Sequence, residues 1–213
     1  MKKFNWWSIL LVIPIALGSF IAFSGDKFYE LEKAIFNAVR MLAPFADIPS
    51  RAITELGSAV GVISVTAIIL IATIIKKEYF FTFGLPVAAT SIVSRIINIT
   101  IKNLIDRERP DFKVLQASES SFPSGHAQNN MALYISILLV ALLIDIAPKW
   151  RCTLKISFIA LPIIIGITRI YFGVHYVSDV LAGLGIGALV AVVTHYIYFK
   201  IYYNLKEKSN AKT

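Results

Sequence analysis

The sequence predicts an all-α integral membrane protein, a bundle of six transmembrane helices that forms a single domain over residues 1–213. The chain is 57% hydrophobic and only 16% charged, whereas a soluble domain is about 25% charged. Its apolar residues are grouped in runs of about 20, the length of a helix that crosses about 30 Å of hydrocarbon. One bundle of such helices uses nearly the whole chain. The single cysteine, Cys152, cannot form an internal disulfide.

The first two predicted elements are an apolar span and an amphipathic segment. Residues 4–23 are expected to be a retained transmembrane helix rather than a signal peptide, because the apolar run exceeds the 7–15 residues of a signal core. Between residues 25 and 51, apolar positions spaced by three and four predict a short helix on the membrane surface, bounded by Pro44 and Pro49. This segment either covers a site or rests on the interface.

Five further spans follow, with polar connections between them. They are expected at residues 55–75, 80–101, from 122–126 to about 146, 156–171, and from about 175 to 203. Residues 102–122 and 148–155 are predicted connections, and 204–213 a flexible tail. Arg95 is a charge inside the third span, and such a charge faces the protein interior or an interface. It either pairs with polar groups between helices or supports an active site.

The basic residues indicate how the bundle is oriented. With both termini in the cytoplasm, compact basic clusters such as Lys76–Lys77 fall on the cytoplasmic side, as the positive-inside tendency requires. The formal net charge of +8 is explained in this way, so no nucleic-acid partner is expected. Three polar stretches then meet on the extracytoplasmic face: residues 102–109, 124–126 and 169–179.

Those stretches bring permanent cations to one membrane face. Clustering Lys102, Arg109 and Arg169 in a partly dry place is unfavourable unless an anion joins them. Arginine forks match phosphate oxygens, and lysine adds a point charge. Ser124 and Gly125 are expected at a helix N-terminus, where free N–H groups bind phosphate and a hydroxyl adds a donor. The pattern therefore predicts an oxyanion site for a phosphoryl group.

Two histidines are assigned different roles at this site. His175 and Asp179 are four residues apart, so they are neighbours on a helix that begins near His175. A carboxylate beside an imidazole keeps one ring nitrogen protonated and directs the other outward as a base or nucleophile. His175 can then attack phosphorus, while His126 protonates the leaving oxygen and later activates water. His195, far along the last helix, is interpreted as a hydrogen-bonded interior histidine.

No metal or other cofactor is expected, because the cations already supply charge stabilisation. Acidic residues at 106, 108 and 111 alternate with Arg107 and Arg109, a pattern that favours a solvated charged loop over a metal site.

The polar stretches also resemble a known family. Three groups of residues carry the resemblance: Lys102 with Arg109-Pro110, Pro123-Ser124-Gly125-His126, and Arg169 with His175 and Asp179. They are similar to the three signature motifs of the type 2 phosphatidic acid phosphatase superfamily, and cover residues 102–179. The third motif of that family usually begins Ser-Arg, whereas this chain has Thr168-Arg169, which keeps the hydroxyl.

The resemblance implies His175 as nucleophile, Asp179 as its partner and His126 as acid, without a metal. It implies as phosphate ligands Lys102, Arg109, Ser124, Gly125 and Arg169. The expected activity is hydrolysis of a lipid phosphate monoester or pyrophosphate at the outer leaflet. Undecaprenyl pyrophosphate, phosphatidylglycerol phosphate and phosphatidic acid are the candidate substrates. Two alternatives stay open: a lipid phosphotransferase, and a transporter or flippase that binds lipid phosphate without cleaving it.

Overall fold

The computed structural model describes residues 12–43, 45–117, 120–143 and 147–210, and all regular elements within these ranges are helical. The expected all-α fold is therefore confirmed. The α-helices are α1 (Val12–Phe23), α2 (Tyr29–Arg40), α3 (Asp47–Leu56), α4 (Ala59–Ile75), α5 (Leu85–Ile105), α6 (Gly125–Ala141), α7 (Pro148–Tyr171) and α8 (Val177–Asn210). Short helices of other types are η2 (Gly25–Phe28), η3 (Lys77–Tyr79) and η4 (Phe80–Gly84).

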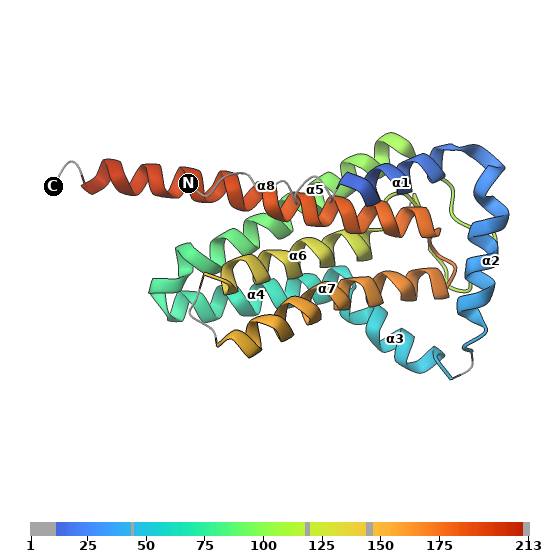
Figure 1. The fold of residues 1–213 in the computed structure, drawn as a ribbon, viewed down its shortest axis with the longest axis horizontal. Coiled ribbons are helices and arrows are strands. Elements are labelled where there is room, and N and C mark those ends of the chain that lie inside the picture. The colour runs from blue at the N-terminus through green and yellow to red at the C-terminus, as the bar shows by residue number, and fades with distance from the viewer. Residues whose placement is uncertain (1–11, 44, 118–119, 144–146, 211–213) are drawn as a thin grey trace.

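Helix α6 lies in the centre of the bundle, between α5, α7 and α8 (Figure 1). Helices α6 and α8 approach closely because small residues of α8 face the α6 backbone. A Cβ at Gly183 would lie 2.7 Å from the Ser124 carbonyl oxygen, and one at Gly187 would lie 2.2 Å from that of Gln128. Such contacts between small residues and backbone are typical of helices that associate in membranes.

One end of the bundle gathers the segments that carry the predicted site. Figure 1 shows the start of α8, the end of α7 and helix α2 together at this end. Helix α5 stops there because Asp106 has φ 44°, a left-handed conformation, and the chain continues into the connection that leads to α6. The structure thus brings three sequence stretches, far apart in the chain, to the same end.

Several helices are long and apolar enough to cross a bilayer. Within the described residues these are Phe80–Ile105, Lys149–Tyr171 and Val177–Asn210. Helices α3 and α4, bent by 50° at their junction, make a fourth if the pair counts as one broken span. Helix α6 has 17 residues and the described part of α1 has 12, fewer than the roughly 20 residues of a complete span. Residues 4–11 of the expected first span lie outside the described residues. Membrane insertion is supported, while the number six stays a prediction.

The segment at 25–51 differs from the expected surface helix. It forms two helices, and Pro49 lies in the first turn of α3, where proline is tolerated. The buried residues of α2 are Glu32 and Phe36, whereas Leu31 is exposed. Phe36 stacks on Phe112 of the 106–124 connection, with ring centroids 4.6 Å apart. Helix α2 therefore covers the end of the bundle.

Two boundary predictions are wrong. Residues 148–155, expected as a loop, form the first two turns of α7, which has a proline in its first turn as many helices do. Residues 204–210, expected as a flexible tail, continue helix α8 to Asn210. Residues 211–213 of that tail lie outside the described residues.

Candidate active site

A cavity of about 210 Å³ lies inside the site end of the bundle. Six of the eight residues predicted for the site line it: Lys102, Arg109, Gly125, His126, Arg169 and His175. The other two, Ser124 and Asp179, are fully buried behind it. Ser124 is the N-cap of α6, and its backbone N–H donates to the Asp179 carbonyl oxygen at 3.0 Å. The predicted residues thus meet in one place.

Most of the predicted residues that line the cavity lie at the end of a helix or in a short turn. Lys102 lies in the last turn of α5, Arg169 in the last turn of α7, and Gly125 begins α6. His175 lies in the turn between α7 and α8, where Gly173 has φ +63°. A Cβ at Gly173 would lie 2.9 Å from the Phe112 carbonyl oxygen, so this turn needs glycine both for its conformation and for space.

The hydrogen-bond partners of His175 fix its tautomer. Arg109 Nη1 lies 3.3 Å from His175 Nε2. Because a guanidinium has no acceptor, Nε2 must be the acceptor and Nδ1 carries the proton. Nδ1 in turn lies 3.4 Å from Oδ2 of Asp179. Burial lowers the pKa of His175 to about 4, although the nearby Asp179 carboxylate raises it. The imidazole is therefore neutral at physiological pH, with its lone pair on Nε2.

The cations have partners that orient them. Arg109 Nη1 donates to the Val174 carbonyl oxygen at 2.6 Å, and Arg169 Nη1 donates to Thr54 Oγ1 at 2.7 Å. Lys102 Nζ donates to the Ser120 carbonyl oxygen. These contacts fix the positions of three cationic side chains that line the pocket.

Buried polar atoms without a partner concentrate around this pocket. Among the described residues, Asn98 Oδ1 and Arg169 Nε are buried without a hydrogen-bond partner, and both belong to lining residues. Within the same residues, Ser124 Oγ and Ser120 Oγ are also buried without a partner, whereas the only contact of His175 Nδ1 is the one with Asp179 at 3.4 Å. Because buried polar groups are normally satisfied, such a cluster marks a place where a ligand or water completes the hydrogen bonding.

A second layer of charge behind Asp179 was not predicted from the sequence. Arg107 Nη1 donates to Asp179 Oδ1 at 2.5 Å and to Ser178 Oγ at 2.8 Å. Arg107 Nη2 lies 3.3 Å from Glu32 Oε2, and Glu32 Oε1 accepts from the Ser178 backbone N–H at 2.9 Å. The guanidinium also lies over the Tyr176 ring, 4.1 Å from its centroid. The prediction that Arg107 belongs to a solvated loop is wrong.

The sequence held weak signals for these residues. Glu32 stands four residues before Phe36 on one face of α2, so a buried charge on that helix could have been suspected. Asn98 precedes Lys102 by four on α5 and donates to the Pro123 carbonyl oxygen at 3.3 Å. No local pattern indicates that Arg107 pairs with buried carboxylates while the adjacent Asp106 and Glu108 are exposed.

The other assignments concern metal ligands and His195. Among the described residues, no three His, Cys, Asp or Glu side chains form a group that could hold a metal ion. His195 is buried and its Nε2 lies 2.6 Å from Ser136 Oγ, as expected for a hydrogen-bonded interior histidine.

A helical membrane bundle with a positive pocket and a buried histidine–aspartate pair defines a class of membrane proteins built to bind phosphoryl groups. The family model of the PAP2 superfamily matches residues 79–203. The chain belongs to this superfamily.

Relatives and a solved structure agree with this assignment. Phosphatidylglycerophosphatase B of Bacillus subtilis is 31% identical over 192 residues, which cover 89% of this chain and 91% of that protein. Undecaprenyl-diphosphatase of Sulfolobus acidocaldarius is 26% identical over 208 residues, 91% of each protein. The crystal structure of a PAP2-type phosphatidylglycerolphosphate phosphatase from Bacillus subtilis has a TM-score of 0.80 at 27% identity, covering 92% of this chain and 98% of that one. The expected enzyme class, a lipid phosphate hydrolase, is confirmed.

Proposed function

We propose that the protein is a multi-pass cell-membrane phosphatase that removes the terminal phosphoryl group of a lipid at the extracytoplasmic face, through a phosphohistidine on His175. The observation that carries the proposal is the buried His175–Asp179 pair at a pocket lined by Arg95, Lys102, Arg109 and Arg169. A neutral imidazole with its proton on Nδ1 presents the Nε2 lone pair to phosphorus. The candidate substrates are undecaprenyl pyrophosphate, phosphatidylglycerol phosphate and phosphatidic acid.

The first chemical step forms a nitrogen–phosphorus bond. The Nε2 lone pair of His175 attacks phosphorus while the bond from phosphorus to the leaving oxygen breaks. The negative charge of the bound phosphoryl group favours the protonated form of His126, and this imidazolium gives its proton to the leaving oxygen. Asp179 stabilises the positive charge that develops on the imidazole. The phosphoryl oxygens are held by Lys102, Arg109, Ser124, Gly125 and Arg169, where charge develops in the transition state.

The second step returns the enzyme to its starting state. Water attacks phosphorus, His126 takes a proton from that water, and the bond from phosphorus to Nε2 breaks. The products are inorganic phosphate and the lipid without its terminal phosphoryl group. If an alcohol replaced water, the same site would transfer the phosphoryl group, so the phosphotransferase alternative is separated by assays with and without an acceptor lipid.

The position of the site on the outer face is supported by charge. The helix ends opposite the site carry basic residues: Lys76, Lys77, Lys149, Arg151, Lys155, Lys200, Lys206 and Lys208. Figure 1 shows the end of α4 and the end of α8 away from the site. Basic segments face the cytoplasm, so the proposal has six spans, both termini cytoplasmic and one membrane-embedded domain.

The test is phosphate release by purified protein in detergent with EDTA present, using the three candidate lipids. His175→Ala should abolish release from every lipid, and His195→Gln, a substitution of a buried histidine outside the pocket, should retain it. Brief incubation with a lipid labelled on its terminal phosphate should leave an acid-labile label on the wild-type protein and none on His175→Ala. Release that survives His175→Ala would refute the nucleophile and favour a role in binding or transport.

A further inference from the structure

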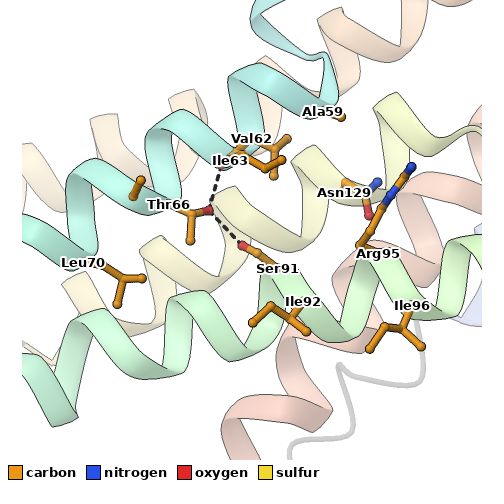
Figure 2. Close-up of a pocket in the computed structure, with 11 residues that line it drawn as sticks. Ala59, Val62, Ile63, Thr66, Leu70, Ser91, Ile92, Arg95, Ile96 and Asn129 are labelled. Atoms are coloured by element: carbon orange, nitrogen blue, oxygen red, sulfur yellow. Dashed lines mark hydrogen bonds between the residues drawn. The ribbon is translucent and has the colours of Figure 1, made fainter.

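An apolar groove lies between α4 and α5 (Figure 2). It has a volume of about 380 Å³ and is lined along α4 from Ala59 to Leu70, a length of about 16 Å at 1.5 Å per residue. Ala59, Val62, Arg95 and Asn129 line both the groove and the pocket. The two cavities are therefore neighbours that share part of their walls.

The wall of the groove suits a hydrocarbon chain. Its two hydroxyl side chains are already satisfied, since Thr66 donates to the Val62 carbonyl oxygen at 2.8 Å and Ser91 donates to the Val87 carbonyl oxygen at 3.1 Å. Their own oxygens lie 3.2 Å apart, as Figure 2 shows. Most other lining side chains are aliphatic. The groove extends about half of the roughly 30 Å of a bilayer core, so a lipid tail can follow it from the pocket into the membrane.

Arg95 is the charged residue among those that line the groove. It is exposed in the middle of α5, a membrane-spanning helix, and its guanidinium has no hydrogen-bond or ion-pair partner within the described part of the chain. In Figure 2 its side chain lies beside Asn129, at the end of the groove nearest Ala59. A charge at membrane depth is unfavourable unless it meets an anion or water. The position therefore suits an anionic group of the substrate.

The spacing along α5 places that anion. Arg95, Asn98 and Lys102 follow one stripe of the helix, with about 10.5 Å between the first and the last along the helix axis. A lipid whose tail lies in the groove passes Arg95 before its terminal phosphoryl group reaches Lys102.

We propose that Arg95 binds a second phosphoryl group of the substrate, the one between the hydrocarbon tail and the phosphoryl group that is cleaved. This inference rests on the proposed function of the site. It names the substrate class as lipids with two phosphoryl groups in series, either a prenyl diphosphate or a phospholipid with a phosphomonoester on its head group. Phosphatidic acid, with one phosphate, leaves Arg95 without this partner.

The test compares two pairs of lipids with matched tails. One pair is dioleoyl phosphatidylglycerol phosphate and dioleoyl phosphatidic acid, and the other is a prenyl diphosphate and its monophosphate. Arg95→Gln should lower kcat/KM for the two-phosphate member by about 10- to 100-fold more than for its partner, the range expected for one lost hydrogen bond to a charged group. The ratio within a pair does not depend on the fraction of enzyme that is folded.

Two further variants sharpen the comparison. Arg95→Lys keeps the charge and should recover part of the preference for the two-phosphate lipid over its one-phosphate partner. Ile92→Ala shortens an uncharged groove residue and should lower kcat/KM by the same factor for both lipids of a pair. Equal losses within both pairs for Arg95→Gln would overturn the proposal while leaving the phosphatase function intact. A failure of the function itself is recognised separately, because wild-type protein would then release no phosphate from any of the four lipids.

Discussion

Arg107→Met removes the one guanidinium that joins two buried carboxylates behind the candidate nucleophile. The Arg107 side chain is 18% exposed, that of Glu32 5%, and that of Asp179 is fully buried. Breaking a buried ion pair by deleting one partner costs about 3–5 kcal/mol, because the remaining charge is left uncompensated. Asp179 keeps the Tyr176 backbone N–H at 2.9 Å and Glu32 keeps the Ser178 N–H. We therefore expect a loss of about 3 kcal/mol of unfolding free energy, at the lower end of that range.

The matched control is Arg40→Met. Arg40 also contacts a carboxylate, Asp47, at 2.6 Å, and lies over the ring of Tyr171, 4.6 Å from its centroid, but its ion pair is partly open to solvent. Exposed pairs contribute about 0–1 kcal/mol. The midpoint temperature of thermal unfolding in detergent should fall by about 6–12 °C for Arg107→Met, on the scaling of domains of this size. For Arg40→Met it should fall by much less. Equal shifts for the two variants would show that burial of the network does not matter.

The same variants test whether Arg107 positions the active site. Because it acts through Asp179 on the His175 ring, its loss should lower kcat on the order of 10–100-fold, the effect of misplacing a reacting group, with KM little changed. Arg107→Lys should restore part of kcat, and Glu32→Gln in the Arg107→Met background should recover stability by removing one orphaned carboxylate. If the folded fraction of Arg107→Met had an unaltered kcat, the positioning role would be refuted and Arg107 would contribute to stability alone.

Three further predictions concern the chemistry. The pKa of His175 is lowered to about 4 in the folded protein from an unfolded value of about 6.5. Between these two values the unfolded chain binds more protons than the folded one. The contribution of neutral His175 to stability is therefore present above pH 6.5 and is lost as the pH falls towards 4. Titration of ¹³C-labelled histidines, assigned with His175→Ala, should show its midpoint well below 6.5, and a midpoint at or above 6.5 would contradict the burial argument. Asp179→Asn should retain more phosphate release than His175→Ala, because it misorients the imidazole without deleting it; equal losses in single-turnover assays would assign Asp179 a larger role. Phosphate release should persist after prolonged EDTA treatment and buffer exchange, and a lasting loss restored by a divalent cation would overturn the metal-free mechanism.

The residues that line the pocket could be predicted because they are unusual in this chain. Charges and histidines are rare in a sequence that is 57% hydrophobic, and each requires a physical reason to lie near an apolar span. Lys102, Arg109 and Arg169 stood out on that ground alone. Helix geometry then brought His175 and Asp179 together, since residues four apart are neighbours.

The supporting layer could not be predicted in the same way. Glu32 and Arg107 are 75 residues apart in the chain, and their contact depends on how α2 crosses the end of the bundle. The errors at helix ends have a local cause. Lysine and arginine are good helix formers, so the basic segment at 148–155 and the residues up to Asn210 continue helices although their charge suggested loops.

The supporting layer also bears on the choice between a hydrolase and a protein that only binds lipid phosphate. Binding requires the three cations and the N-terminus of α6, and these would hold a phosphoryl group without any histidine. Binding alone does not explain why Asp179 is completely buried and paired with Arg107. Nor does it explain why Oδ2 of Asp179 lies 3.4 Å from His175 Nδ1. Burying charged groups is costly, and here the arrangement orients one imidazole whose other nitrogen lies 3.3 Å from Arg109 at the pocket. That geometry is explained if His175 reacts with phosphorus, which makes its substitution the most discriminating change in the molecule.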